Sequence, residues 1–400
     1  MSTNSQRLPT AVAAIVALGM LVTVSGCGGA TSDKATLDKA TSGCTSIALA
    51  SVGPVTGPDS SNGRPPRNGA ELAVRKYNAA HAGCPVGLLT YDTQGIPDNA
   101  LNLADGIVAD PQIVGIIGPV FSGETAAMTP VTDKGGVPVI TASATNPSLS
   151  QKGWTTFHRI VGNDAAQGPA AAIFMTERLG VHRVAVVDDT GLYGKTIADL
   201  TTKNLKSSGV VVPVRISVDP ESVDYPDAIA AIAGAHVDAV YFGGVGKPGG
   251  RLLSQMRGAG ITVPFVGGDG IYTPDFIGDS GGTSAGAIMT CPCVNSARPT
   301  TAKQTSFAES YRNTFGGDPG YFAAEYYDAA NLFLDAIGSG QTTRAGIERW
   351  LRTANSVGLT KTIQFDRTGE VKAGAVFVFR VDDQGNFVPT AEVRNGKLVK

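Results

Sequence analysis

The chain has 400 residues, of which 42% are hydrophobic and 16% charged, and its 32 basic and 34 acidic side chains give a net charge of −2. This composition is typical of a folded globular protein and excludes a disordered one. The balanced charge lacks the basic stripe that nucleic-acid binding requires, so we expect no nucleic acid among its partners.

Residues 1–26 are typical of a signal peptide. Arg7 precedes an apolar run over 11–24 that is too short to cross a membrane, and V-S-G-C directly follows it. This ending resembles a bacterial lipobox, in which Cys27 is acylated and becomes the first mature residue. Residues 27–43 are small and polar, as in a flexible tether. The sequence therefore predicts a lipid anchor at the outer face of the cytoplasmic membrane; a secreted protein with a stray cysteine is the alternative.

Short apolar runs alternate with amphipathic stretches from residue 46 onwards. The expected strands are 47–50, 88–91, 114–117, 137–140, 184–187, 211–216, 239–242 and 264–266, and the expected helices are 68–78, 99–109, 125–132, 165–179, 195–207, 225–233 and 250–258. This alternation predicts an α/β fold of doubly wound parallel sheets with helices on both faces. The length exceeds what one hydrophobic core usually serves, so we expect two lobes.

The lobe boundaries are predicted from breaks in this alternation. A short strand at 157–160 has no helix of its own before it, and Asn163 or Asp164 can cap a new helix behind it. We therefore assign 44–162 plus about 294–360 to lobe one and 163–293 plus about 361–400 to lobe two. In the returning part, helices are expected at 303–315, 321–337 and 343–351 and strands at 363–365 and 375–381. Several crossings between lobes suit hinge closure around a ligand.

Four cysteines follow Cys27, in a compartment where disulfides persist. Cys44 and Cys84 each directly precede a predicted strand. If these two strands pair in parallel, both cysteines lie at one edge of the sheet, so we predict a Cys44–Cys84 disulfide. Cys291 and Cys293 could form a local bridge; as a metal pair they would be poor, because no histidine or second cysteine pair lies nearby. We expect no metal.

A loop rich in hydroxyl groups follows the strand predicted at 137–140. Ser143, Ala144 and Thr145 lie at the carboxyl end of this strand, where open parallel sheets bind ligands. The loop offers hydroxyls, amides and carbonyls but no group that takes a proton at neutral pH, so it is suited to hold a small polar molecule rather than to change it. Ser122, after the preceding strand, is expected to cap a helix whose free amides attract a carboxylate; a cap without a ligand is the alternative.

Several motifs point to one family. The chain carries T-G-P at 56–58, N-G-A-E-L-A at 68–73, Y-D at 91–92, G-P-x-x-S-x-x-T at 118–125 and S-A-T-N-P-S-L-S-Q-K-G-W-T-T-F-H-R-I-V-G-N-D-A-A-Q-G-P at 143–169. Together they resemble the branched-chain amino acid-binding proteins of ABC importers, which have the type 1 periplasmic binding fold. The resemblance implies an extracytoplasmic, monomeric, non-enzymatic protein without cofactors, which delivers a zwitterionic amino acid or close analogue to permease and ATPase subunits by hinge closure.

The same resemblance implies roles for individual residues. Ser122 and Thr145 would hold the ligand's carboxylate, while the Ser143 carbonyl, the Thr145 hydroxyl and Asp269 would hold its ammonium group. Tyr193 would reach the ligand from lobe two, and Ala144 lies in the binding loop. An exposed turn is the alternative for Asp269.

The side-chain end of the implied site departs from the family pattern. Asn62 and Val245 stand where relatives often carry aromatic residues, which predicts a wider or more polar pocket. Tyr321 could supply an aromatic wall, although it could equally belong to the core. The sequence therefore predicts an amino acid headgroup in the ligand more firmly than a branched aliphatic side chain. An amide or a urea-like molecule is the alternative ligand.

Three other functions were weighed against this one. G-x-G-x-x-G at 244–249, with Asp269 about twenty residues later, fits a dinucleotide fingerprint, but Pro248 removes an amide and no second mononucleotide half follows. Hydrolase motifs are absent from the sequence, and its four histidines are scattered. A ligand-sensing receptor component of the same fold is the remaining alternative, and neighbouring permease or kinase genes would discriminate between the two.

Overall fold

The computed structural model describes residues 46–372 and 374–399. The predicted signal peptide, Cys27, the tether and Cys44 lie outside these residues. Within the described part of the chain, no helix is both long and apolar enough to cross a membrane.

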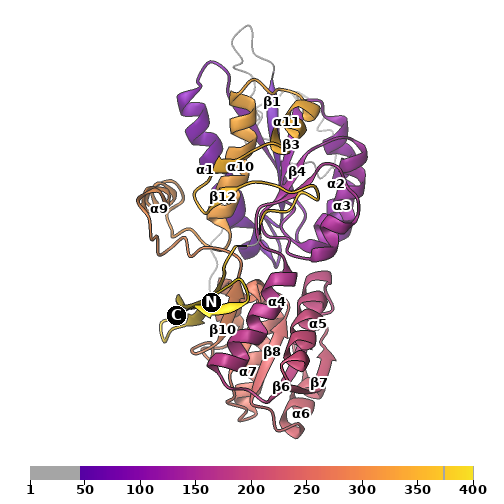
Figure 1. Cartoon of the computed structure of the whole chain (residues 1–400), viewed down its shortest axis with the longest axis vertical. Helices are drawn as coiled ribbons and strands as arrows, with labels where there is room; N and C mark the ends of the chain where they lie inside the picture. Colours follow the sequence, from indigo (N-terminus) through magenta and orange to yellow (C-terminus); the bar gives the residue numbers. More distant parts are fainter. Residues whose placement is uncertain (1–45, 373, 400) are drawn as a thin grey trace, which may run out of the picture. The chain divides into compact units, whose positions relative to one another are not determined.

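Five parallel strands form the first sheet in the order β2-β1-β3-β4-β5 (Figure 1). Their bounds are β1 Ile47–Gly53, β2 Val86–Asp92, β3 Ile113–Ile117, β4 Val139–Thr141 and β5 Phe157–Arg159. Ile47 lies opposite Val86, so the strands that follow Cys44 and Cys84 pair in parallel, as predicted. Because β1 has β2 on one side and β3 on the other, the direction of winding reverses beside β1.

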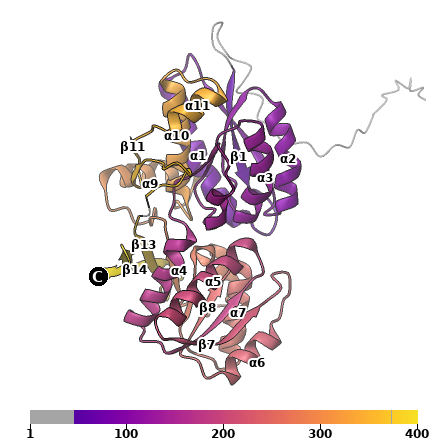
Figure 2. The ribbon, with the colours of Figure 1, turned by 45° about the vertical axis from the view of Figure 1, so that its right-hand side comes forward.

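Helices cover both faces of this sheet. Helices α1, α10 and α11 lie on one face and α2 and α3 on the other (Figures 1 and 2). The strand pattern explains this division: Ile47 and Leu49 of β1 pack with the first group, whereas Ala50 and Val52 pack with the second, because successive side chains point to opposite faces. The bounds are α1 Ser60–Ala80, α2 Pro97–Ala109, α3 Ser122–Lys134, α9 Ala302–Phe315, α10 Ala323–Gly338 and α11 Arg344–Leu351.

All six helices differ from their predicted bounds, and two of these differences have a clear cause. Helix α1 begins eight residues earlier than expected, because it accommodates Pro65 and Pro66 in its interior. Helix α10 begins two residues later, because Phe322 before it is left-handed with φ of 51°. Helix α10 also packs tightly on β3: a Cβ on Gly115 would lie 2.3 Å from Phe333 Cε1, so only glycine leaves room for the ring.

The second sheet has eight strands in the order β15-β14-β13-β10-β9-β8-β6-β7. Their bounds are β6 Arg183–Asp188, β7 Val211–Ser217, β8 Ala239–Gly243, β9 Phe265–Gly267, β10 Ile288–Cys291, β13 Val376–Val381, β14 Phe387–Arg394 and β15 Lys397–Val399. Strands β6 to β10 are parallel, and β13 to β15 add an antiparallel extension. The winding reverses beside β6, which lies between β7 and β8.

Helices also cover both faces of the second sheet. Helices α4 and α5 pack on Val184 and Val186, whereas α6 and α7 pack on Ala185 and Val187. The Asn163 side chain accepts a hydrogen bond from the Ala165 amide at the start of α4, as predicted for a cap. The bounds are α4 Asp164–Ile173 with a π-helical continuation Phe174–Arg178, α5 Leu192–Ser207, α6 Pro226–Gly234, α7 Gly246–Gly258 and α8 Pro274–Asp279.

Three chain segments connect the elements of the two sheets. The first follows β5, the second runs from β10 to α9, and the third runs from α11 through β11 Ser356–Val357 and β12 Thr362–Ile363 to β13. Arg159 at the end of β5 forms a buried ion pair with Glu370, which ties the first segment to the third. We propose that each sheet with its helices is one lobe, with the boundaries predicted above.

Candidate ligand-binding site

The loops at both winding reversals line one cavity of about 480 Å³. In open α/β sheets, ligands bind at the carboxyl ends of the strands where the winding reverses. The first sheet contributes the loops after β1, β2 and β3, and the second contributes those after β6, β7 and β8. The lining residues include Asp59, Pro97, Phe121, Ser122, Glu124, Asp189, Leu192, Tyr193, Glu221, Val245, Lys247 and Arg251.

Ser122 lies at the first-sheet wall of this cavity and is 2% exposed. It is the first residue of α3, and Phe121 takes the cap position that we predicted for Ser122. The reason is that Glu124, three residues after Phe121, accepts a hydrogen bond from the Phe121 amide at 2.8 Å. The Ser122 hydroxyl accepts a hydrogen bond from the Asn146 amide at 3.2 Å, so it joins the start of α3 to the loop after β4.

The loop after β4 is fixed from behind by a buried arginine. Arg159 donates hydrogen bonds of 2.8 Å from its Nη1 to the carbonyls of Ala144 and Asn146. The Ser143 hydroxyl donates to the Val120 carbonyl at 2.7 Å and shares a hydrogen bond with the Tyr326 hydroxyl. The loop therefore has a defined conformation, and its Ser143 hydroxyl serves the structure.

Tyr193 and Asp269 meet at the second-sheet wall. The Tyr193 hydroxyl donates to Asp269 Oδ1 at 2.7 Å, and Gln167 Nε2 donates to the same oxygen at 2.8 Å. Burial raises the pKa of Asp269 to about 6, although both of these hydrogen bonds lower it. Asp269 is 1% exposed, so the structure excludes the exposed turn that was its alternative.

Thr145 and Asp164 form the back of the site. Both are fully buried, and the Asp164 amide donates to the Thr145 carbonyl at 2.9 Å. Within the described residues, neither the Thr145 hydroxyl nor the Asp164 carboxyl oxygens have a hydrogen-bond partner of good geometry. Burial first, and then the nearby charge of Asp269, raise the pKa of Asp164 well above its usual value. These unpaired groups are suited to meet a bound polar molecule.

The space between the two walls is narrow. An inner cavity of about 10 Å³, bounded by Ser122, Ser143, Tyr193, Asp269 and Tyr321, continues the outer cavity inwards. This volume holds about one water molecule, so an amino acid headgroup can enter only when the walls move apart. Val245 lines both the inner and the outer cavity.

Asn62 is buried behind the start of α1 and is not among the residues that line these two cavities. Neither atom of its side-chain amide has a hydrogen-bond partner within the described residues. Its predicted role beside the ligand's side chain stays a prediction.

Several residues in or beside the site were missed at the level of sequence. Asp164 was considered only as a cap, and Gln167 not at all, yet they lie three residues apart on one face of α4 beside Asp269. Two polar residues spaced three apart on a helix that follows a strand are the pattern from which they could have been predicted. Asp59 lies in the loop after β1 and Lys247 in the first turn of α7, which follows β8. Only the strand order shows that both reach one cavity.

Four buried carboxyl groups make the stability of the fold depend on pH. Burial raises the pKa of Asp189 and Asp269 to about 6 and that of Glu124 and Glu325 to about 7. Between pH about 4 and 7 the folded state therefore binds more protons than the unfolded state, so stability falls as the pH rises. We expect the free energy of unfolding in urea to be lower at pH 8 than at pH 5 by at least about 1 kcal/mol. An equal or higher value at pH 8 would contradict this assignment.

The glycines of the G-x-G-x-x-G motif serve helix packing. A Cβ on Gly246 would lie 2.2 Å from the Thr273 hydroxyl, and one on Gly249 would lie 2.9 Å from the Ile271 side chain. These glycines let α7 approach the segment after β9. The same motif begins α7 itself, which runs Gly246–Gly258.

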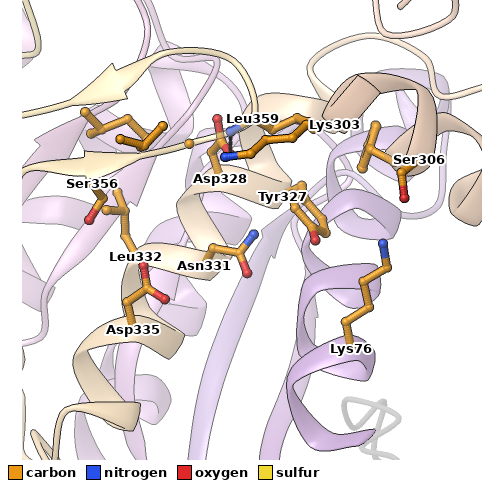
Figure 3. Close-up of a pocket in the computed structure, with 14 residues that line it drawn as sticks. Lys76, Lys303, Ser306, Tyr327, Asp328, Asn331, Leu332, Asp335, Ser356 and Leu359 are labelled. Atoms are coloured by element: carbon orange, nitrogen blue, oxygen red, sulfur yellow. Dashed lines mark hydrogen bonds between the residues drawn. The ribbon is translucent and has the colours of Figure 1, made fainter. Parts of the chain in front are cut away.

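A second cavity of about 380 Å³ lies away from the strand ends, between α1, α9, α10 and the β11–β12 pair (Figure 3). Lys76 lies 5.6 Å from the ring centre of Tyr327, and Asp328 accepts a hydrogen bond from the Leu359 amide at 2.6 Å. Asp328 therefore holds the β11–β12 connection in place. No group of three or more potential metal ligands occurs among residues 46–372 and 374–399.

One disulfide that the sequence left open is present in the structure. Cys291 and Cys293 are bonded to each other, with Sγ atoms 1.97 Å apart, at the start of the second crossing. Cys84 is disulfide-bonded. Its predicted partner, Cys44, lies outside the described residues, so that pairing stays a prediction.

Two doubly wound sheets whose reversal points line one cavity define a two-lobed substrate-binding protein. The chain belongs to the periplasmic binding protein family, whose sequence profile matches residues 46–386. The resemblance that the motifs indicated is thereby confirmed.

Relatives in this family span most of the chain. The leucine-, isoleucine-, valine-, threonine- and alanine-binding protein of Pseudomonas aeruginosa is 29% identical over 329 residues, which cover 82% of this chain and 87% of the relative. The Leu/Ile/Val-binding protein BraC3 of Rhizobium johnstonii is 30% identical over 305 residues, or 76% and 79% of the two chains.

Solved structures agree with this assignment. The leucine-binding protein LivK of Thermotoga maritima superposes with a TM-score of 0.79 at 25% identity, over 87% of this chain and 99% of that one. The isoleucine complex of LivJ from Streptococcus pneumoniae has a TM-score of 0.78 at 23% identity and covers 86% of this chain and all but 1% of its own, which supports the fold.

Proposed function

We propose that this protein binds a free amino acid, or a close zwitterionic analogue, between its two lobes and presents it to the permease of an ABC importer. The observation that carries the proposal is the meeting of complementary groups at the facing strand ends. Ser122 and the free amides of α3 lie on one wall, and half-buried Tyr193 with its partner, buried Asp269, lies on the other. Helix amides favour a carboxylate, and a buried carboxylate favours an ammonium group.

The proposed site assigns each headgroup contact to residues of this chain. Ser122 and Thr145 hold the carboxylate, whereas the Ser143 carbonyl, the Thr145 hydroxyl and Asp269 hold the ammonium group. The buried Thr145 hydroxyl supports this assignment, because it lies beside the Asp164 carboxyl group without a hydrogen bond of good geometry and can bond to a ligand. No step of this function transfers a proton, which is consistent with a binding protein rather than an enzyme.

Calorimetry over the twenty free amino acids tests this function. We expect saturable binding of at least one amino acid near 1 μM, which corresponds to about −8 kcal/mol. Four or five charge-assisted hydrogen bonds, each contributing about 1.5–3 kcal/mol before ordering costs, support an affinity of this order. If none of the twenty binds, the amino acid assignment is wrong, while the fold is unaffected.

We propose that the Asn146 side chain stabilises the closed arrangement of the two lobes. Its side-chain amide donates to the Leu192 carbonyl at 3.1 Å and to the Thr196 hydroxyl at 2.9 Å, and both acceptors belong to α5 of the other lobe. Because closure forms these bonds only in the compact state, we expect Asn146→Ala to weaken amino acid binding by roughly 3–10-fold. Ser150→Ala is the control, since the Ser150 hydroxyl bonds only to Pro147 within the same loop. Equal affinities for both variants would remove this role.

The location and assembly follow from the same proposal. Residues 1–26 would be removed as a signal peptide, and acylated Cys27 would hold the protein at the outer face of the cytoplasmic membrane. The tether 27–43 would leave the folded part free to meet the permease and ATPase subunits as a monomer. A Cys44–Cys84 disulfide would fasten the end of the tether to the first sheet.

A further inference from the structure

The outer cavity extends well beyond the headgroup contacts. Its volume of about 480 Å³ lies within the range of about 300–1,000 Å³ that is typical of small-molecule sites. It shares Phe121, Ser122, Tyr193 and Val245 with the inner cavity, so a ligand held by its headgroup would direct its side chain into this space. Phe121, Leu192 and Val245 provide apolar walls for a carbon chain.

Several charged residues line this space, among them Glu221 and Arg251, and two of opposite charge, Asp59 and Lys247, face it from the two lobes. Asp59 precedes α1 in the first lobe, and Lys247 lies in the first turn of α7 in the second. Gly95, with φ of +80°, leaves room for Asp59, because a Cβ there would lie 2.7 Å from Asp59 Oδ2. The cavity is therefore shaped around this carboxyl group.

Both the Asp59 carboxyl group and the Lys247 ammonium group can still bond to a ligand. Within the described residues, no hydrogen bond reaches the Asp59 carboxyl group and no acidic group lies within 4 Å of the Lys247 ammonium. Burial raises the pKa of Asp59, whereas the charge of Lys247 lowers it. The other cation of the cavity, Arg251, is engaged with Asp279 and the carbonyls of Pro220 and Ser222.

The chemistry of this pair selects among side chains. An anionic terminus would meet Asp59, and a cationic one would meet Lys247, so each would leave one half-buried charge opposed. An aliphatic side chain would cover both polar groups without bonding to either, which costs free energy. A carboxamide or ureido group satisfies both, because its NH₂ donates to Asp59 while its carbonyl accepts from Lys247.

We propose that the ligand is an α-amino acid whose side chain ends in a carboxamide or ureido group, with Asp59 and Lys247 as the specificity-determining residues. This inference rests on the proposed function, and it distinguishes this chain from its branched-chain-binding relatives. It also accounts for Val245 standing in place of an aromatic residue, since a polar side chain has less need of an aromatic wall.

Calorimetry with five ligands tests the inference on the mature protein. We expect L-glutamine or L-citrulline to bind at least about tenfold more tightly than L-leucine, since a polar site discriminates strongly against an apolar analogue. L-Glutamate and L-lysine should both bind more weakly than the preferred ligand. Equal or tighter binding of L-leucine, or no binding of L-glutamine and L-citrulline, overturns the inference but leaves the proposed function intact. The proposed function fails only if none of the twenty amino acids binds.

Two variants test whether Asp59 and Lys247 cause the preference for an amide or ureido side chain. Asp59→Asn and Lys247→Met should each reduce the preference for the amide or ureido ligand to within about threefold, because that ligand loses a hydrogen bond to a charged group and L-leucine no longer covers one of the two charges. Lys195→Met is the matched control, because Lys195 is exposed on α5 and is not among the residues that line the cavity. If the full preference persists in both cavity variants, these residues do not determine specificity.

Discussion

Replacing Asp269 with asparagine should weaken amino acid binding by about 10–100-fold. The substitution keeps the size of the side chain and removes the only charge that we assign to the ligand's ammonium group. A hydrogen bond to a charged group contributes about 1.5–3 kcal/mol, and about 1.4 kcal/mol corresponds to tenfold in affinity. Calorimetry with the amino acid that binds the wild-type protein measures this change.

The control for this variant is Asp199→Asn. Asp199 lies on α5, where it pairs with Arg215 at 2.7 Å and is 58% exposed. Its substitution should leave the affinity within about twofold of the wild type, because exposed ion pairs contribute about 0–1 kcal/mol to stability and Asp199 does not face the ligand. If Asp269→Asn behaved like this control, the ammonium contact would lie elsewhere.

Replacing Arg159 with methionine should lower both stability and affinity. Arg159 is fully buried, pairs with Glu370 and holds the carbonyls of Ala144 and Asn146. The substitution leaves Glu370 without its charge partner, and removing one member of a buried pair typically costs about 3–5 kcal/mol. We expect urea denaturation to show a loss of this size and calorimetry to show weaker binding, because the loop that ends in Asn146 loses its support.

The matched control is Arg352→Met. Arg352 is 44% exposed and pairs with Glu348 at 2.8 Å, so its loss should change the free energy of unfolding by less than about 1 kcal/mol. Equal stability losses in both variants would show that the buried pair has no special role. If Arg159→Met lost stability but kept its affinity, Arg159 would stabilise the fold without supporting the binding loop.

The order of strands and helices could be predicted from the sequence because each strand of the parallel sheets is a short apolar run. Strand β14 escaped prediction, since Pro389 and a mixture of polar and apolar residues hide its pattern. The start of α1 also escaped prediction, because Pro65 and Pro66 indicate a break that the folded chain tolerates. Local pattern therefore predicts elements whose burial is strong and fails where tertiary packing overrides propensity.

The site was predictable to a smaller extent. Ser122 and Thr145 follow strands directly, so their place at the sheet edge could be inferred from the sequence. The presence of Asp59 and Lys247 in one cavity could not be inferred in this way, because the two residues are far apart in the sequence and follow strands of different sheets. The engagement of the Ser143 hydroxyl by Tyr326 also depends on the return of α10 to the first sheet, which no local pattern reveals.

A crystal structure of the complex with the tightest-binding amino acid would show whether the ligand lies between the facing strand ends of the two sheets. We predict that the ligand's carboxylate lies within hydrogen-bond distance of Ser122 and the first amides of α3, and that its ammonium group lies within the same distance of Asp269. We also expect Tyr193 and Tyr321 to have moved apart, since the inner cavity now has a volume of only about 10 Å³. A ligand seated instead in the cavity between α1, α9 and α10 would contradict the account.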